Sequence, residues 1–304
     1  MLVVDCPDST GVRANGVGAR ELFVPAANDI PSASGRNPMA SDRSSLARRV
    51  YASHSRSLEW ANETFEADGA RFVRNRDHPN IFDANHVSHA TCESERDIER
   101  LFARVEREYA HCPHRRFDVD PWTPPAFVAR LTLDGYVADE DLLLVLEGEL
   151  QARPAPCDIR RVETEEQWAG SAALHELDWL ERWKRLGRTP EPSVPGAFAA
   201  LRRKSPPDVA YWMAYHDGMP VAYAWSWQGV DGVGVVEDLF THPDYRHRGI
   251  ATALIAHGVA DARARGAGPV IISADPGDTP KHMYRALGFR PIVVVRHYVR
   301  RLSD

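Results

Sequence analysis

A short basic stretch, residues 245–255 (YRHRGIATALI), lies where a strand gives way to an apolar helix. The first amides of a helix have no partner within it, and together with the helix dipole they attract an anion. Gly249 has no Cβ, so a phosphate can approach the backbone there, while Arg246 and Arg248 add hydrogen-bond donors. The alternative, a helix with misplaced basic residues, is disfavoured because positive charge at this end opposes the dipole. The stretch therefore predicts a phosphate-binding helix start.

Two motifs resemble the signatures of the GCN5-related N-acetyltransferase (GNAT) superfamily. Arg246-x-x-Gly249-x-Ala251 is similar to its acyl-CoA pyrophosphate loop, and residues 283–289 (MYRALGF) are similar to its second signature, Tyr-x-x-x-Gly-Phe. Both occur in order over residues 157–304, separated by a helix and a buried strand. The resemblance implies an acyl-CoA cosubstrate, acetyl-CoA, with the acyl group itself left open. The residues that it implies for CoA binding are Leu239, Phe240, Thr241, Arg246, His247, Arg248, Gly249, Ile250, Ala251 and Thr252.

Acyl transfer to an amine needs a base and an acid. An alkylammonium with a pKa of about 10.4 is almost wholly charged at pH 7, so its proton must leave before the nitrogen attacks. Glu237 and Asp238 lie on the strand expected to face the thioester, and we expect only one to reach the acceptor, because neighbours in a strand point to opposite sides. The run EDLF resembles that of spermidine/spermine-type acetyltransferases, which implies that Glu237 is the base. Asp238 is the second choice, and binding of the substrate cation is the alternative role of Glu237.

The resemblance also supplies the acid. Tyr284 is similar in position to the superfamily's tyrosine, which implies that its hydroxyl protonates the departing CoA thiolate; packing of its helix on the sheet is the alternative. A backbone N–H of the strand before the loop is expected to polarise the thioester carbonyl. Acidic residues beside tryptophans at 176–183, and aromatic residues at 211–227, could line a pocket for a cationic amine, although most of these aromatics are expected in the core.

The elements that must position these residues alternate between strand and helix. An amphipathic helix over 165–186 is followed by two strands joined at Asp217-Gly218, a strand over 232–243, the quoted helix, a buried strand, a short helix and a last strand. This order predicts an α/β (α+β) fold with a mixed, mostly antiparallel sheet flanked by helices. We expect a flexible tail over residues 1–41, with Met39 a possible true start, and a proline-rich linker near 150–157.

The segment 42–152 contains a weak copy of residues 153–304. At a constant offset of 153 positions, Gly288-Phe289 falls on Gly135-Tyr136, and strands and helices also coincide over about 85–148. The residues expected to bind phosphate and donate a proton are missing from this copy. ESERDI (93–98) aligns with RHRGIA (246–251), and Leu131 aligns with Tyr284. We expect a degenerate half that does not bind CoA in the usual way and acts as a scaffold or as one wall of the acceptor site. The fold before residue 85 stays open.

Other functional classes fit less well. GVGVVE lacks the last glycine and the helix of a dinucleotide fingerprint, and there is no Walker lysine pattern and no Gly-x-Ser-x-Gly. Histidines and cysteines crowd residues 86–114, but their spacings fit no common zinc site, so we expect no metal. Hydrophobic content of 43% and a net charge of −6 indicate a globular, cytoplasmic protein without nucleic-acid or membrane partners, and scattered cysteines agree with a reduced compartment.

The sequence thus predicts an acetyl-CoA-dependent N-acetyltransferase acting on a primary amine of a small cationic molecule, by direct attack in a ternary complex. Three alternatives stay open. They are a non-catalytic acyl-CoA sensor or interaction module on the same fold, an interaction protein with a structural metal, and an acyltransferase for protein or peptide acceptors. The oligomeric state and the acceptor stay unassigned.

Overall fold

The computed structural model describes residues 38–152, 154, 156–187 and 189–302. Most of the tail expected over residues 1–41 lies outside these ranges. Its expected end at residue 41 falls within helix α1, which begins at Pro38; proline is favoured at the first position of a helix. Among the described residues, no helix has the length and apolar character needed to cross a membrane.

The described chain holds seven α-helices and eleven strands, in the alternating order expected for the C-terminal half. The helices are α1 (Pro38–Ser57), α2 (Glu95–Glu108), α3 (Pro125–Leu133), α4 (Glu165–Arg185), α5 (Ser193–Arg202), α6 (Ile250–Ala264) and α7 (Pro280–Ala286), with short 3-10 turns η1 (Phe82–Ala84) and η2 (Pro243–Tyr245). The strands are β1 (Glu63–Ala67), β2 (Ala70–Arg74), β3 (His86–Ser88), β4 (His114–Val119), β5 (Val137–Leu146), β6 (Asp158–Arg161), β7 (Val209–His216), β8 (Met219–Val230), β9 (Val233–Thr241), β10 (Val270–Ala274) and β11 (Arg290–Arg301).

Local signals in the sequence set several of these boundaries. Thr164 starts α4 with a capping box, since its hydroxyl accepts from the Gln167 N–H at 3.2 Å and the Gln167 side chain accepts from the Thr164 N–H at 2.9 Å. Asp217 and Gly218 both have positive φ, 50° and 79°, which suits the tight turn between β7 and β8. Helix α5 has no counterpart in the elements expected from the sequence.

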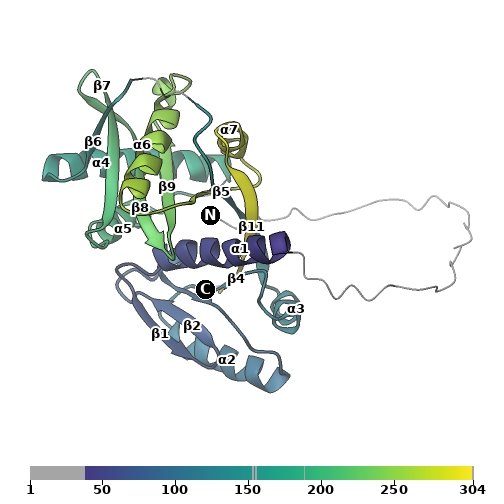
Figure 1. Ribbon diagram of the computed structural model, residues 1–304. Helices are drawn as coiled ribbons and strands as arrows, with labels where there is room; N and C mark the ends of the chain where they lie inside the picture. The colour runs from purple at the N-terminus through teal and green to yellow at the C-terminus, as the bar shows by residue number, and fades with distance from the viewer. Residues whose placement is uncertain (1–37, 153, 155, 188, 303–304) are drawn as a thin grey trace, which may run out of the picture.

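All eleven strands form one sheet, in the order β1-β2-β3-β4-β11-β5-β10-β9-β8-β7-β6. Only β3 with β4 and β9 with β10 pair in parallel, and every other neighbouring pair is antiparallel. The predicted mixed, mostly antiparallel sheet flanked by helices is therefore confirmed (Figure 1).

The two halves of the chain repeat one order of elements and exchange their last strands. β1, β2, β3, α2, β4, α3 and β5 correspond to β7, β8, β9, α6, β10, α7 and β11. β11 lies between β4 and β5, while β5 lies between β11 and β10, so each half receives a strand from the other. The prediction of two related halves is confirmed, whereas the boundary near residue 152 stays a prediction because the sheet is continuous across it.

The offset of 153 residues holds where the last helix turns into the exchanged strand. Gly135 and Gly288 both have positive φ, 76° and 105°. The Tyr136 N–H donates to the Leu131 carbonyl at 3.1 Å, and the Phe289 N–H donates to the Tyr284 carbonyl at 3.0 Å. Leu131 thus occupies the backbone position of Tyr284 in the N-terminal half. Before residue 85, where the sequence predicted no fold, the chain forms the β1–β2 hairpin.

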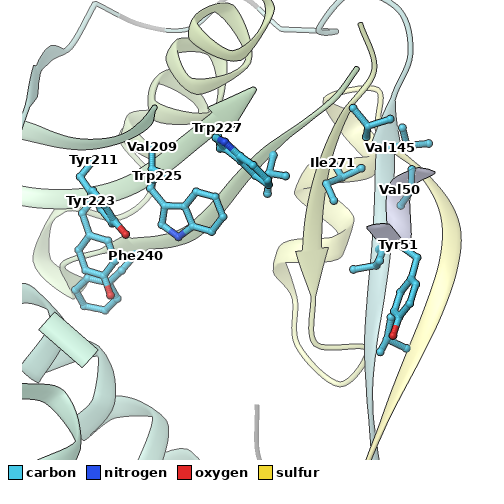
Figure 2. Close-up of a cluster of buried hydrophobic side chains, with 14 of the residues drawn as sticks. Val50, Tyr51, Val145, Val209, Tyr211, Tyr223, Trp225, Trp227, Phe240 and Ile271 are labelled. Carbon is cyan, nitrogen blue, oxygen red and sulfur yellow. The ribbon is translucent and has the colours of Figure 1, made fainter. Parts of the chain in front are cut away.

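Helices cover both faces of the sheet, and β5 contributes to the core on each face. Leu143 and Val145 of β5 pack in a cluster with α1 and with aromatic residues of β7 and β8, of which Figure 2 shows a part. Leu144 and Leu146 point to the opposite face and pack with α6 and α7. A further cluster, formed by α2, α3 and β4, is the core of the N-terminal half.

Because β5 and β11 join the halves, we expect the chain to unfold as one unit. Leu143 is fully buried, so Leu143→Ala should lower the free energy of unfolding by about 2–5 kcal/mol. Urea unfolding with hydrogen exchange on peptides from β2 and β8 measures this, and both peptides should lose protection together. The control Leu133→Ala removes a side chain that is 80% exposed and should change stability by less than about 0.5 kcal/mol. Loss of protection in the C-terminal half alone would contradict the prediction.

Candidate active site

The site begins where β9 separates from β10. The two parallel strands pair only at Gly234 with Val270 and at Val235 with Ile271, although β9 continues to Thr241. The register of β9 against β8 also shifts in this region, and Asp238 has a φ of 58°. A positive φ and a shifted register are the marks of a β-bulge, which bends a strand and turns its backbone groups. The bulge leaves backbone and side chains of residues 237–241 facing an open space.

The start of α6 presents free amides to the same space. Its N-cap, Gly249, has a φ of 79° and makes no side-chain capping bond, and His247 also has a positive φ of 61°. Positive and negative φ values close together turn neighbouring N–H groups toward one point, which makes an anion-binding nest. Gly249, Ile250, Ala251 and Thr252 line the space, so the predicted phosphate-binding geometry lies at its edge.

The two arginines of the loop differ in what they contact. Arg246 lines the space, but its guanidinium forms a bidentate pair with Glu181 of α4 at 2.8 and 2.6 Å, and its Nε donates to the Thr241 carbonyl at 2.9 Å. A contact of Arg246 with pyrophosphate therefore requires that pair to open. Arg248 is exposed, donates to the Asp244 carbonyl at 3.0 Å and is the one expected loop residue that does not line the space.

These elements enclose a cavity of about 970 Å³. The residues expected to bind CoA that line it are Leu239, Phe240, Thr241, Arg246, His247, Gly249, Ile250, Ala251 and Thr252. Tyr284 and Met283 of α7 border the same cavity. The cavity is long enough to continue past α7 and β9 to residues of α1, η1, β4, β5 and β11. The structure thus brings together nearly every site residue that the sequence predicted.

Glu237 bridges the gap between the diverging strands. One carboxylate oxygen accepts from the Ser273 N–H at 2.6 Å and the other from the Ser273 hydroxyl at 2.8 Å. The side chain is half-buried because it borders the cavity. Burial raises the pKa of Glu237 to about 8, aided by the charge of Asp141, while the Ser273 hydrogen bonds oppose the shift. A carboxyl with a pKa near neutrality can take a proton from an amine more readily than an ordinary one.

Asp238 lies beside Glu237 on the cavity wall, so the expectation that only one of the two can face the site is wrong. The bulge at Asp238 breaks the alternation of a regular strand. Asp238 pairs with Arg202 of α5 and accepts from the Trp225 indole at 3.0 Å. These partners satisfy its charge and leave Glu237 as the better candidate for a base.

Tyr284 is 5% exposed and packs in the cluster under α6 and α7, as its alternative role requires, and it also borders the cavity; its role as the acid stays a prediction. Burial raises its pKa well above the ordinary value, and the charges of Glu237 and Asp278 raise it further. The hydroxyl therefore stays protonated at neutral pH and can act as a donor at the cavity wall.

The aromatic residues of β7 and β8 are mostly core, as expected, since Tyr211, Tyr223, Trp225 and Trp227 are all buried. Tyr211 and Trp225 also reach the cavity. Of the acidic residues on α4, Asp178 and Glu181 line the cavity, and Asp178 accepts from the Tyr223 hydroxyl at 2.9 Å.

The copy of this site in the N-terminal half is closed. Ser94 caps α2 by accepting from the Asp97 N–H at 3.2 Å, and the first turn carries Glu95 and Asp97. No residue of the stretch 93–98 lines the cavity. A capped, acidic helix start repels a phosphate, and the absence of CoA binding by this half stays a prediction.

The histidines of the middle segment are held by hydrogen bonds rather than gathered. His86 Nδ1 lies 2.9 Å from the Asp83 carbonyl, His89 Nε2 lies 3.0 Å from the Ser55 hydroxyl, and His114 Nε2 lies 3.2 Å from the Asn85 carbonyl. Within the described ranges, no group of three or more His, Cys, Asp or Glu side chains is arranged to hold a metal ion.

Sequence reasoning missed the partners of the site and its far end. Ser273 and Arg202 hold Glu237 and Asp238, and nothing in their local sequence marks them; Glu181 was expected at an amine pocket, not as the partner of Arg246. His54, Asp83, Arg116, Asp141 and His297 also line the cavity, and only the pairing of β5 and β11 brings them there.

Comparison with protein families identifies the C-terminal half. Residues 172–289 match the model of the acetyltransferase (GNAT) family. No curated protein matches the sequence significantly.

Solved structures share the fold over most of the chain. A GCN5-related N-acetyltransferase from Kribbella flavida is 18% identical, with a TM-score of 0.63 over 85% of this chain and 96% of that one. A functionally unknown conserved protein from Staphylococcus epidermidis is 15% identical, with a TM-score of 0.63 over 82% and 97%. A tandem GNAT protein from the clavulanic acid biosynthesis pathway is 14% identical, with a TM-score of 0.52 over 72% and 76%. At these identities the likeness shows the fold alone.

The geometry of the α6 start predicts that Gly249→Ala weakens CoA binding about tenfold. A Cβ disfavours the left-handed φ of Gly249, so the loop would leave the conformation that aligns its amides. Isothermal titration calorimetry with CoA measures the affinity. The matched control is Gly266→Ala beyond the other end of α6, where φ is 101° and no atom crowds an added Cβ. Equal loss of affinity in both variants would contradict the prediction.

Proposed function

We propose that this chain, whose C-terminal half belongs to the GNAT acetyltransferase superfamily, transfers an acetyl group from acetyl-CoA to a primary amine of a small cationic molecule. One observation carries the proposal: the free amides of α6, the bulged strand β9, Glu237 and Tyr284 all border one cavity. The amine would attack directly, with both substrates bound at once.

The expected contacts of acetyl-CoA can be assigned to individual residues of the cavity wall. The pyrophosphate of acetyl-CoA would accept from the amides of Gly249 to Thr252, and the pantetheine arm would lie along the open edge of β9 at Leu239 to Thr241. The thioester would then lie at the point where β9 and β10 separate, between Glu237 and Tyr284. A backbone N–H of the bulged strand is well suited to polarise the thioester carbonyl.

The alkylammonium loses two protons on becoming an acetamide, and the thiolate gains one. Glu237, in its ionised form, takes a proton from the alkylammonium, and the neutral nitrogen attacks the carbonyl carbon to give a tetrahedral oxyanion. Collapse of this intermediate breaks the carbon–sulfur bond. The departing thiolate receives a proton from the Tyr284 hydroxyl, which burial keeps protonated until that step, and the second proton of the acylated nitrogen passes to the resulting tyrosinate. The products are an acetamide and free CoA.

We expect a thiol-release assay with acetyl-CoA to detect turnover with small amines. In that assay Tyr284→Phe should lower kcat about 100-fold while the KM for acetyl-CoA changes less than about threefold, because the hydroxyl acts only as sulfur departs. Tyr298→Phe is the control, since it removes the hydroxyl of another buried tyrosine, which packs in the core of the N-terminal half. Turnover unaffected by Tyr284→Phe would refute the assigned acid, and CoA binding without release with any amine would favour a sensor.

The raised pKa of Glu237 predicts the pH dependence of the reaction. The base must be ionised, so kcat/KM should rise with pH and level off above about pH 8. Glu237→Gln should remove this limb and lower kcat about 100-fold or more. Ser273→Ala should move the limb to higher pH, because it removes a hydrogen bond that favours the ionised carboxylate. A pH profile that is the same in wild type and Glu237→Gln would exclude Glu237 as the base.

A further inference from the structure

The cavity does not end at Glu237. Beyond it the wall is formed by His54 of α1, Asp83 of η1 and Asp141 of β5, all of which belong to the N-terminal half. Acetyl-CoA, as placed above, uses the end of the cavity near α6 and α7. The end formed by the N-terminal half is therefore left for the acceptor.

Two carboxylates make this end of the cavity acidic. The side chains of Asp83 and Asp141 are 34% and 17% exposed, so both reach the cavity. Asp141 comes to lie near Glu237 because β5 pairs with β10, the strand that carries Ser273. In this register, Leu143 of β5 pairs with Ser273 of β10. Asp141 lies two residues from Leu143 along β5, so its side chain is on the same face of the sheet as those of Leu143 and Ser273.

A buried network holds the two carboxylates in place. Arg116 of β4 binds Asp118 through two bonds, at 2.6 and 3.0 Å, and also pairs with Asp83. His297 of β11 lies between Asp118, at 2.7 Å, and Asp141, at 3.3 Å. Burial alone would lower the pKa of His297, but the charge of Asp118 and the hydrogen bonds to both carboxylates raise it. The network is rigid because Arg116, Asp118 and His297 are all nearly inaccessible.

The network leaves a negative charge uncompensated. Three carboxylates, Asp83, Asp118 and Asp141, face at most two cations, Arg116 and His297, and His297 also lies 2.8 Å from the Arg116 guanidinium through Nδ1. At the opposite end of the cavity, Arg185, Arg202 and Arg246 each pair with an acidic residue. Arg182, which also lines the cavity, lies over the Trp179 ring, so a cationic ligand is the natural complement of the uncompensated carboxylate charge.

His54 supplies a second, independent sign of a ligand. Its side chain is 6% exposed, it lines the cavity, and its Nε2 has no hydrogen-bond partner in the part of the chain that is described. Burial lowers its pKa, so the imidazole is neutral. A buried polar nitrogen without a partner is costly unless a ligand or water satisfies it.

We propose that His54, Asp83 and Asp141 form a subsite for a second cationic group of the acceptor, which is therefore a compact dication such as an aliphatic diamine. The inference rests on the proposed function. One ammonium loses its proton to Glu237 and is acetylated, while the other stays charged between Asp83 and Asp141, with His54 as a hydrogen-bond partner. The degenerate half, which lost the CoA loop, thus supplies the recognition of the acceptor.

The test compares α,ω-diamines of three to eight carbons with amino alcohols of the same lengths. The best diamine should exceed its amino alcohol at least tenfold in kcat/KM at saturating acetyl-CoA. Asp141→Asn and Asp83→Asn should each reduce this preference about tenfold, since an amide keeps the shape but not the charge. Asp139→Asn, on the same strand but outside the cavity, should leave the preference unchanged.

A binding experiment distinguishes failure of the proposed subsite from failure of the proposed function. Calorimetry of the same diamine with CoA-saturated protein needs no turnover and should show weaker binding in Asp141→Asn and Asp83→Asn, while CoA affinity of both variants stays at the wild-type value. Diamine binding without acetylation of any amine would overturn the proposed function and support the subsite. Acetylation with no diamine preference, or a preference that survives both substitutions, would overturn the subsite.

Discussion

Hydrogen bonding between β9 and β10 stops after two residue pairs, and the rest of the site depends on that interruption. Continued pairing would close the sheet where the cavity now lies. The backbone N–H of Ser273 loses a strand partner at this point, and the Glu237 carboxylate replaces it at 2.6 Å. An unpaired buried amide is costly, so the contact that keeps the gap open also fixes Glu237 against the cavity and explains why its carboxyl can be held in a desolvated position.

The exchange of β5 and β11 extends this gap into a cavity shared by two halves. Asp141 and His297 lie on the exchanged strands, and each reaches the site of the opposite half only because of that exchange. A row of polar groups then crosses adjacent strands, from Glu237 and Ser273 to Asp141, His297 and Asp118. Polar residues in a sheet interior are tolerated when each is satisfied, and here each has a partner on the next strand or borders the cavity.

How much the sequence could predict depends on the range of the interaction. Gly249 and Tyr284 belong to short motifs, so their places followed from local order. The faces of Glu237 and Asp238 were predicted from the regular alternation of a strand, which the bulge at Asp238 breaks; a bulge leaves no certain mark in one sequence. The pair of Arg246 with Glu181 spans 65 positions, and the cluster around Asp141 needs strands from both halves, so neither could be derived from spacing.

The two halves have diverged in complementary ways. In one, the start of α6 is open, with a left-handed glycine and no capping side chain; in the other, the start of α2 is capped by Ser94 and carries acidic residues. The buried ion pair of Arg116 and Asp118 on β4 would contribute nothing to a second CoA site. The same pair does help to hold a fixed anionic wall in place. The N-terminal half carries this wall where the C-terminal half carries the loop before α6, and the position of Asp141 beside Glu237 follows from the pairing of β5 with β10. In the proposed reaction, the C-terminal half binds the donor and the N-terminal half recognises the acceptor.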